Sequence, residues 1–247
     1  MPHLQPNKVP DIKIADPRWK DLYKIGGIAS IMGVIIILLA VIVFLIWPYA
    51  PGFTTTVSVF ETIQHDRLGG LMALDFFLVV GNLISILFYL AIYAALKRVN
   101  ESFALIALVL GLIAVVSLIP ARPILELFAL SDRYAAASNE AERSQYLAAG
   151  EALLTLFNGT AWAVYYFLGP VSGLISSLLM LRSNIFGKAT AYVGIITSII
   201  ACGLLVPGIG PVLAFLSMLG YVIWNILLAR RFLQLGRWSV PDYKDEG

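Results

Sequence analysis

Long apolar runs separated by short polar segments are the dominant pattern along this chain. A membrane-crossing helix takes about 20 mostly apolar residues, and six runs reach or approach that length. Pro207 and Pro211 separate the last two runs, because two prolines in five residues interrupt a continuous helix. The pattern predicts an all-α integral membrane protein, a bundle of six transmembrane helices. The predicted spans are 26–47, 71–96, 103–119, 153–181, 189–206 and 212–229.

The composition excludes several classes of protein. Of the 247 residues, 60% are hydrophobic and 13% are charged, whereas a soluble domain is about 45–50% apolar and about 25% charged. A soluble enzyme, a disordered chain and a disulfide scaffold are therefore excluded. One cysteine and two histidines do not supply the three or four ligands of a usual His/Cys metal centre. The net charge of +2 argues against a nucleic-acid partner.

The sequence contains none of the motifs that mark a catalytic or cofactor site. It has no phosphate-binding G-x-x-x-x-G-K-[ST] motif and no G-x-S-x-G nucleophile motif. No predicted span contains a histidine or a lysine, so a haem site or a retinal Schiff base has no residue to form on. We therefore predict no catalytic residues, no metal and no cofactor.

Basic residues set the predicted orientation. Of the 17 Lys and Arg, 13 fall in segments on one side of the six spans, and the positive-inside rule places that side in the cytoplasm. Both termini are therefore predicted to be cytoplasmic, in the inner membrane of a prokaryotic cell. The four basic residues on the opposite side are Arg67, Arg122, Arg133 and Arg143.

Two segments flank the predicted transmembrane domain of 26–232, and one outer loop lies within it. The arm 1–25 is polar, and its residues 16–24 form either an interfacial helix or a disordered tail. The outer loop 120–152 predicts two short helices, the second leading into the fourth span. Asn139 followed by Glu142 fits a capping box at the start of that second helix. We expect this loop to pack on the membrane surface or over the mouth of the bundle. The cytoplasmic tail is 233–247, and its polar part 237–247 is expected to be functionally silent.

Asp75 is the one ionisable residue well inside a predicted span, and such residues are functional hypotheses by default. At 100° per residue, Asp75 shares an arc of roughly 80° with four polar side chains further along the same helix. A narrow polar stripe faces protein or water, because lipid does not satisfy it. Two interpretations stay open: a ligand or proton path, or structural pairing of Asp75, first with Arg122. The other members of the stripe are Asn82, Ser85, Tyr89 and Tyr93.

The fourth span carries a second polar and aromatic face. Asn158, Trp162 and Tyr165 share this face, and the spacing of Gly169 and Gly173 allows close helix approach. The face is either a binding pocket above a packing seam or a packing seam throughout. Small-residue faces such as this one also allow a homo-oligomer or a larger membrane complex.

Several short segments in the second half of the chain carry a resemblance to a known family. They are 130–137 (LSDRYAAA), 148–153 (AAGEAL), 158–160 (NGT), 181–183 (LRS), 186–191 (FGKATA) and 220–224 (GYVIW), which leads into Arg230 and Arg231. In these segments the chain resembles a family of uncharacterised prokaryotic multi-span membrane proteins that share a domain of unknown function. The resemblance covers about residues 68–236 and implies the same six-span topology, without an activity. It also implies that Asp132, Arg133, Tyr134 and Glu151 are recurring features of the outer loop.

Three functions are compatible with these features. The first is a non-enzymatic accessory or binding subunit of a membrane complex, surrounded by membrane lipids. The second is a transporter or a small-molecule or lipid-binding protein that uses the Asp75 stripe. The third is a membrane enzyme built on the outer carboxylates Asp75, Asp132 and Glu151.

Overall fold

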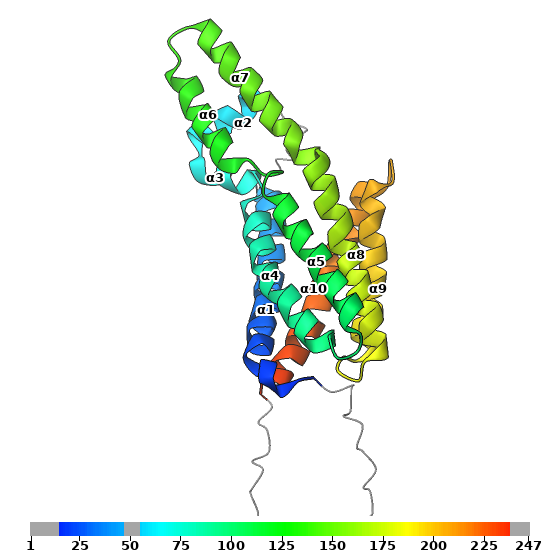
Figure 1. The fold of residues 1–247 in the computed structure, drawn as a ribbon. Helices are drawn as coiled ribbons and strands as arrows, with labels where there is room; N and C mark the ends of the chain where they lie inside the picture. Colours follow the sequence, from blue (N-terminus) through cyan, green and yellow to red (C-terminus); the bar gives the residue numbers. More distant parts are fainter. Residues whose placement is uncertain (1–14, 47–54, 238–247) are drawn as a thin grey trace, which may run out of the picture.

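The computed structural model describes residues 15–46 and 55–237, and within these ranges the chain is helical with no strand. Six helices run side by side as a bundle, and four other helices lie at one end of it (Figure 1). We call these four helices the cap domain, and the opposite end of the bundle its base. Both ends of the described chain lie at the base (Figure 1). The bundle helices are α1 (Lys20–Ile46), α4 (Phe76–Leu96), α5 (Glu101–Leu118), α8 (Thr160–Arg182), α9 (Lys188–Cys202) and α10 (Gly210–Gly236).

The bundle helices form a closed ring. In the order α1, α4, α5, α8, α9, α10, each helix packs against the next, and α10 packs against α1. Polar or aromatic side chains on the inner face of each helix are therefore brought together in the middle of the ring. This arrangement decides which of the predicted site residues meet.

Five segments of the described chain are long and apolar enough to cross a membrane, and the 15-residue α9 is a shorter apolar helix. The helices follow the predicted spans with shifted ends, except that the second span is interrupted at 74–75 and the fourth at 156–159, where a 3₁₀ turn (Leu156–Asn158) precedes α8. The first begins at Lys20, six residues before the predicted span, and therefore includes the last part of the predicted arm. The fifth ends at Cys202, where a 3₁₀ turn (Gly203–Leu205) follows it.

Small residues allow close packing within this chain. A side chain on Gly26 of α1 would collide with Ala91 of α4, and one on Gly111 of α5 would come within 2.6 Å of the Tyr89 ring. A side chain on Gly173 of α8 would lie 2.8 Å from Ser198 Oγ on α9. An assembly of several copies through these faces would therefore have to displace contacts that hold the single chain together.

The cap domain has an apolar core of its own. Its helices are α2 (Thr56–His65), α3 (Arg67–Ala73), α6 (Ile124–Ala136) and α7 (Glu140–Thr155). Phe60, Ile63 and Leu127 are fully buried between them. The predicted helices of the outer loop are confirmed as α6 and α7, which pack on the rest of the cap domain. Asn139 also caps α7 as predicted, because its Oδ1 accepts a hydrogen bond from Glu142 N at 2.9 Å.

Helices α2 and α3 were not among the elements predicted from the sequence. Both helices begin at a polar capping residue: Thr55 Oγ1 accepts from Ser58 N at 3.2 Å, and Asp66 Oδ1 accepts from Gly69 N at 2.8 Å. Such capping residues are an N-terminal signal that is readable from sequence. Residues 56–70 are only weakly apolar and precede a much more apolar run, so the sequence pattern indicates a connection there and not a helix.

Substitution of Leu127 by alanine tests whether the cap domain folds around its own core. A buried leucine contributes about 2–5 kcal/mol relative to alanine, so amide hydrogen exchange in α2, α6 and α7 should accelerate roughly tenfold or more. Leu125 lies on the same helix with 79% of its surface exposed. Leu125→Ala is therefore the matched control and should leave exchange unchanged. Equal exchange in the two variants would contradict a separate core.

Candidate functional site

Arg122 lies where the cap domain joins the bundle, and its guanidinium bonds to three separate connections. Its Nε donates to Asp75 Oδ2 at 2.8 Å, between α3 and α4. Its Nη1 donates to the carbonyl of Ala121 at 2.8 Å, between α5 and α6. The same Nη1 donates to the carbonyl of Phe157 at 3.0 Å, between α7 and α8. One side chain thus joins all three of the described connections between cap domain and bundle.

Aromatic rings enclose the guanidinium. The Cζ atom of Arg122 lies 4.2 Å from the centre of the Trp162 ring and 4.8 Å from that of Phe157. The Arg122 side chain is only 4% exposed, while that of Asp75 is 38% exposed. A buried guanidinium without a partner is strongly destabilising, so the contact with Asp75 stabilises the buried position of Arg122. The predicted pairing of Asp75 with Arg122 is confirmed.

The position of Asp75 in its helix was predicted wrongly. The predicted span 71–96 is interrupted at Leu74 and Asp75, so Asp75 precedes α4 and does not lie within it. Its backbone is left-handed, with φ 65° and ψ 31°, the only such residue other than glycine in the described chain. Aspartate and asparagine adopt this conformation more readily than other residues that have a side chain. The break directs the carboxylate toward Arg122.

Two other members of the predicted stripe form structural hydrogen bonds. Asn82 Nδ2 donates to the carbonyl of Val115 at 2.8 Å and so joins α4 to α5. Ser85 Oγ donates to the carbonyl of Asn82 within its own helix. Tyr93 lies lower on α4, beside the base of the bundle, where Lys97 Nζ is 6.0 Å from its ring centre. The stripe is therefore not a continuous path along α4.

Four tyrosines from three helices come together inside the ring of helices, and we call them the tyrosine group. They are Tyr89 of α4, Tyr165 and Tyr166 of α8, and Tyr221 of α10. The ring of Phe88 lies 5.6 Å from that of Tyr89 and 5.7 Å from that of Trp224, and the Trp224 ring lies 6.2 Å from that of Tyr221. A side chain on Gly169, one turn beyond Tyr165 on α8, would start 3.9 Å from Tyr89 Oη. Trp162 stacks on this group, with its ring centre 5.4 Å from that of Tyr165 and 5.1 Å from that of Tyr166.

Three hydroxyls of the tyrosine group have no hydrogen-bond partner among the described residues. These are the hydroxyls of Tyr89, Tyr165 and Tyr221. Tyr166 differs, because its side chain is hydrogen-bonded to Ser217 of α10. All four side chains remain partly exposed although they face the interior of the ring. Donor groups that are inside the bundle, unpaired and still accessible define the candidate binding site.

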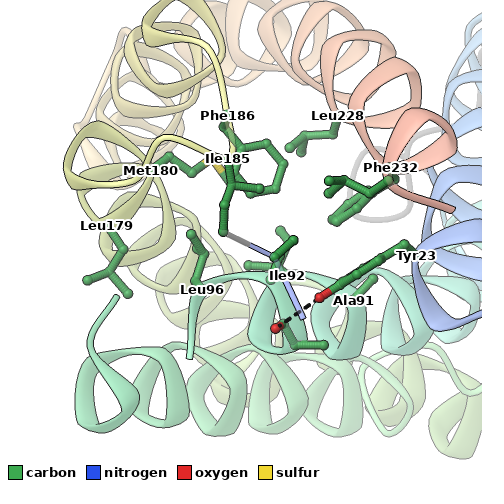
Figure 2. Close-up of a cluster of buried hydrophobic side chains, with 14 of the residues drawn as sticks. Tyr23, Ala91, Ile92, Leu96, Leu179, Met180, Ile185, Phe186, Leu228 and Phe232 are labelled. Atoms are coloured by element: carbon green, nitrogen blue, oxygen red, sulfur yellow. Dashed lines mark hydrogen bonds between the residues drawn. The ribbon is translucent and has the colours of Figure 1, made fainter. Parts of the chain in front are cut away.

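An apolar cluster closes the bundle between the tyrosine group and the base. Figure 2 shows side chains from α1, α4, α8, α10 and the α8–α9 turn meeting there. Tyr23 Oη also donates to the carbonyl of Ala94 at 3.3 Å within this cluster (Figure 2). The site is therefore bounded by the Asp75–Arg122 pair toward the cap domain and by apolar side chains toward the base. The labelled members are Tyr23, Ala91, Ile92, Leu96, Leu179, Met180, Ile185, Phe186, Leu228 and Phe232.

A buried carboxylate at the base was not singled out from the sequence. Asp16 is 2% exposed and lies 2.8 Å from both Arg18 and Arg98. The hydrogen bonds from Arg18, followed by the charge of Arg98, lower the pKa of Asp16 to about 2. Lys97 Nζ lies 4.1 Å from the ring centre of Trp19. These contacts hold residues 15–19, part of the predicted arm, against the α4–α5 turn.

The remaining predicted residues lie outside the candidate site. Arg133, Glu151 and Asn158 are exposed, and Asn158 lies in the turn before α8, outside the tyrosine group. Asp132 is part of the cap domain, where Arg67 Nη2 lies 2.6 Å away and Gln64 Nε2 donates to it at 3.2 Å. Hydrogen bonds from Gln64 and Arg67 lower the pKa of Asp132. These carboxylates therefore do not meet in one cleft with Asp75.

The described residues contain no group of three His, Cys, Asp or Glu that would hold a metal ion. Comparison with known families, characterised proteins and solved structures finds no match to this chain. The function proposed below therefore depends on the geometry of the site.

Replacing Asp75 tests whether its contact with Arg122 stabilises the protein. Asp75→Ala leaves a buried guanidinium unpaired and should destabilise the fold by about 3–5 kcal/mol. Asp75→Asn should cost much less, because asparagine tolerates the left-handed backbone and its amide oxygen still accepts from Arg122. Asp132→Asn, at an exposed ion pair, is the control and should cost at most about 1 kcal/mol. The measurement is thermal unfolding in detergent, and an unchanged Asp75→Ala midpoint would refute the role.

Proposed function

We propose that all six bundle helices cross the membrane, with both termini cytoplasmic and the cap domain outside. The closed ring of six helices supports the count, since α9 packs between two longer helices along the same axis. The clustering of basic residues toward the base supports the orientation. The α8–α9 turn at that end is flanked by the exposed residues Arg182 and Lys188.

Labelling with an impermeant thiol reagent tests this topology. Single cysteines replace Ser138, in the cap domain, and Lys188, at the base, in a chain whose native Cys202 is serine. Both positions are exposed. In intact cells, the cysteine at 138 should be labelled, and the one at 188 should be labelled only after the membrane is permeabilised. Labelling of both from the same side would refute the six-span arrangement.

The geometry best supports a non-enzymatic membrane protein that binds a small molecule within the bundle, beneath the cap domain. The observation that carries this proposal is the proximity of Tyr89, Tyr165 and Tyr221, whose hydroxyls are unpaired among the described residues. The three side chains are partly exposed, so their hydroxyls are available to a ligand. A molecule that offers acceptors to them gains about 0.5–1.5 kcal/mol for each hydrogen bond.

Asp75 and Arg122 have a supporting role in this proposal. Because the two charges neutralise each other, the pair closes the site toward the cap domain without attracting an ion of either sign. The apolar cluster at the base closes the other end. A site closed at the base favours binding over a continuous channel.

Filling the space beside Tyr89 tests the binding function. A side chain on Gly169 would start 3.9 Å from Tyr89 Oη, whereas one on Gly187 would meet nothing within 4 Å. Native mass spectrometry of protein extracted from its own membranes should show a small-molecule adduct. Gly169→Leu should lose this adduct and Gly187→Leu should keep it. Identical spectra for all three proteins would refute binding at this site.

The cap domain supports a second candidate function, as an accessory subunit of a membrane complex. Figure 1 shows α6 and α7 extending away from the bundle as a hairpin. The charged residues Arg133 and Glu151 are exposed on these helices. A fixed protein partner that co-purifies with the wild-type chain, without any small-molecule adduct, would favour this function. Membrane lipids surround the apolar outer faces of the bundle in either case.

A further inference from the structure

The chemistry of the site restricts the class of molecule that it accepts. We infer that the ligand is an uncharged, planar ring compound with hydrogen-bond-accepting oxygens, such as a membrane-soluble quinone. This inference rests on the binding function proposed above and adds the identity of the ligand class. Three separate observations lead to it: the type of polar group present, the absence of a net charge, and the aromatic walls.

The polar groups of the site are suited to acceptor oxygens. A phenolic O–H donates one hydrogen bond, and Tyr89, Tyr165 and Tyr221 have no acceptor among the described residues. The three tyrosines come from α4, α8 and α10, which are separate members of the ring of helices. A ligand with carbonyl or ether oxygens on opposite edges is able to receive hydrogen bonds from more than one of them.

The charges at the site favour a neutral ligand. The Asp75 carboxylate is engaged by Arg122 Nε, and Arg122 Nη1 is engaged by two backbone carbonyls. Each charge of this pair therefore already has a partner of opposite sign. An ionised ligand would have to compete with that pairing in an apolar interior, which is unfavourable.

The walls of the site favour a flat ring. Trp162, Tyr165 and Tyr166 are in mutual ring contact, with centres 5.1–6.1 Å apart. Tyr89 is held against the backbone of Gly111, where any side chain would collide with its ring. Aromatic rings attract one another in offset or edge-to-face arrangements, so a group of aromatic rings favours a planar ring as its ligand. A flexible acyl chain would gain no such contact.

Two ligands with the same methylated ring test this inference, namely duroquinone, which has two carbonyl oxygens, and durene, which has none. Binding is measured by equilibrium dialysis against protein in phosphatidylcholine nanodiscs, with empty nanodiscs subtracted. The wild-type protein should bind duroquinone more tightly than durene. The triple variant Tyr89→Phe/Tyr165→Phe/Tyr221→Phe keeps the rings and removes the hydroxyls. It should bind duroquinone at least tenfold more weakly, since each hydrogen bond contributes about 0.5–1.5 kcal/mol, and bind durene as before.

Matched controls separate the possible outcomes. Tyr192→Phe changes a tyrosine that is 54% exposed on α9 and should leave both affinities unchanged. Equal binding of the two ligands, insensitive to the hydroxyls, would overturn the ligand class and leave the binding function standing. Binding of neither ligand would overturn the ligand class, while the adduct test on Gly169→Leu would then decide the binding function separately. Tighter binding of tetramethylbenzoate than of duroquinone would overturn the assignment to neutral molecules.

Discussion

The Arg122 guanidinium is the interaction on which the architecture depends. The cap domain and the bundle each have an apolar core. The chain is non-helical or in a short turn at each of the three described connections between them. Arg122 bonds to each of these connections. A planar group with five donors in fixed directions is suited to this task, whereas a lysine ammonium has no comparable geometry. Burial between two aromatic rings makes each of these bonds stronger than it would be in water.

The position of this ion pair determines what lies beneath it. The pair closes one end of the ring interior and the apolar cluster closes the other, so the tyrosine group occupies a compartment with no unpaired charge. Such a compartment is unusual within a bundle of apolar helices. The hydroxyls of Tyr89, Tyr165 and Tyr221 are hydrogen-bond donors that have no acceptor among the described residues. Helices pack closely where small residues line up, as at Gly26 and Gly173, and bulky aromatic residues separate them elsewhere.

The apolar runs were sufficient to predict the bundle helices, and the Asn139 capping signal was sufficient for α7. The pairing of Asp75 with Arg122 also followed from sequence, because a carboxylate near the end of one span needs the nearest cation. The helix break at Asp75 was not predictable from the local sequence, because the left-handed backbone there accompanies a contact with Arg122, which is distant along the chain. The convergence of Tyr89, Tyr165 and Tyr221 depends on the ring order of the helices, which no single-helix pattern contains. The burial of Asp16 likewise depends on Arg98, far away along the chain.

The short α9 has a consequence for the surrounding bilayer. A helix of 15 residues is about 22 Å long, while the hydrocarbon core of a typical bilayer is about 30 Å thick. With α9 crossing the membrane as proposed, lipids beside it must thin locally or leave the Pro207–Pro211 turn within the acyl region. Hydrophobic mismatch of this kind sorts proteins among membranes of different thickness. The bundle is therefore thinner on its α9 side than on its α1 side, and it would tilt in a bilayer of uniform thickness.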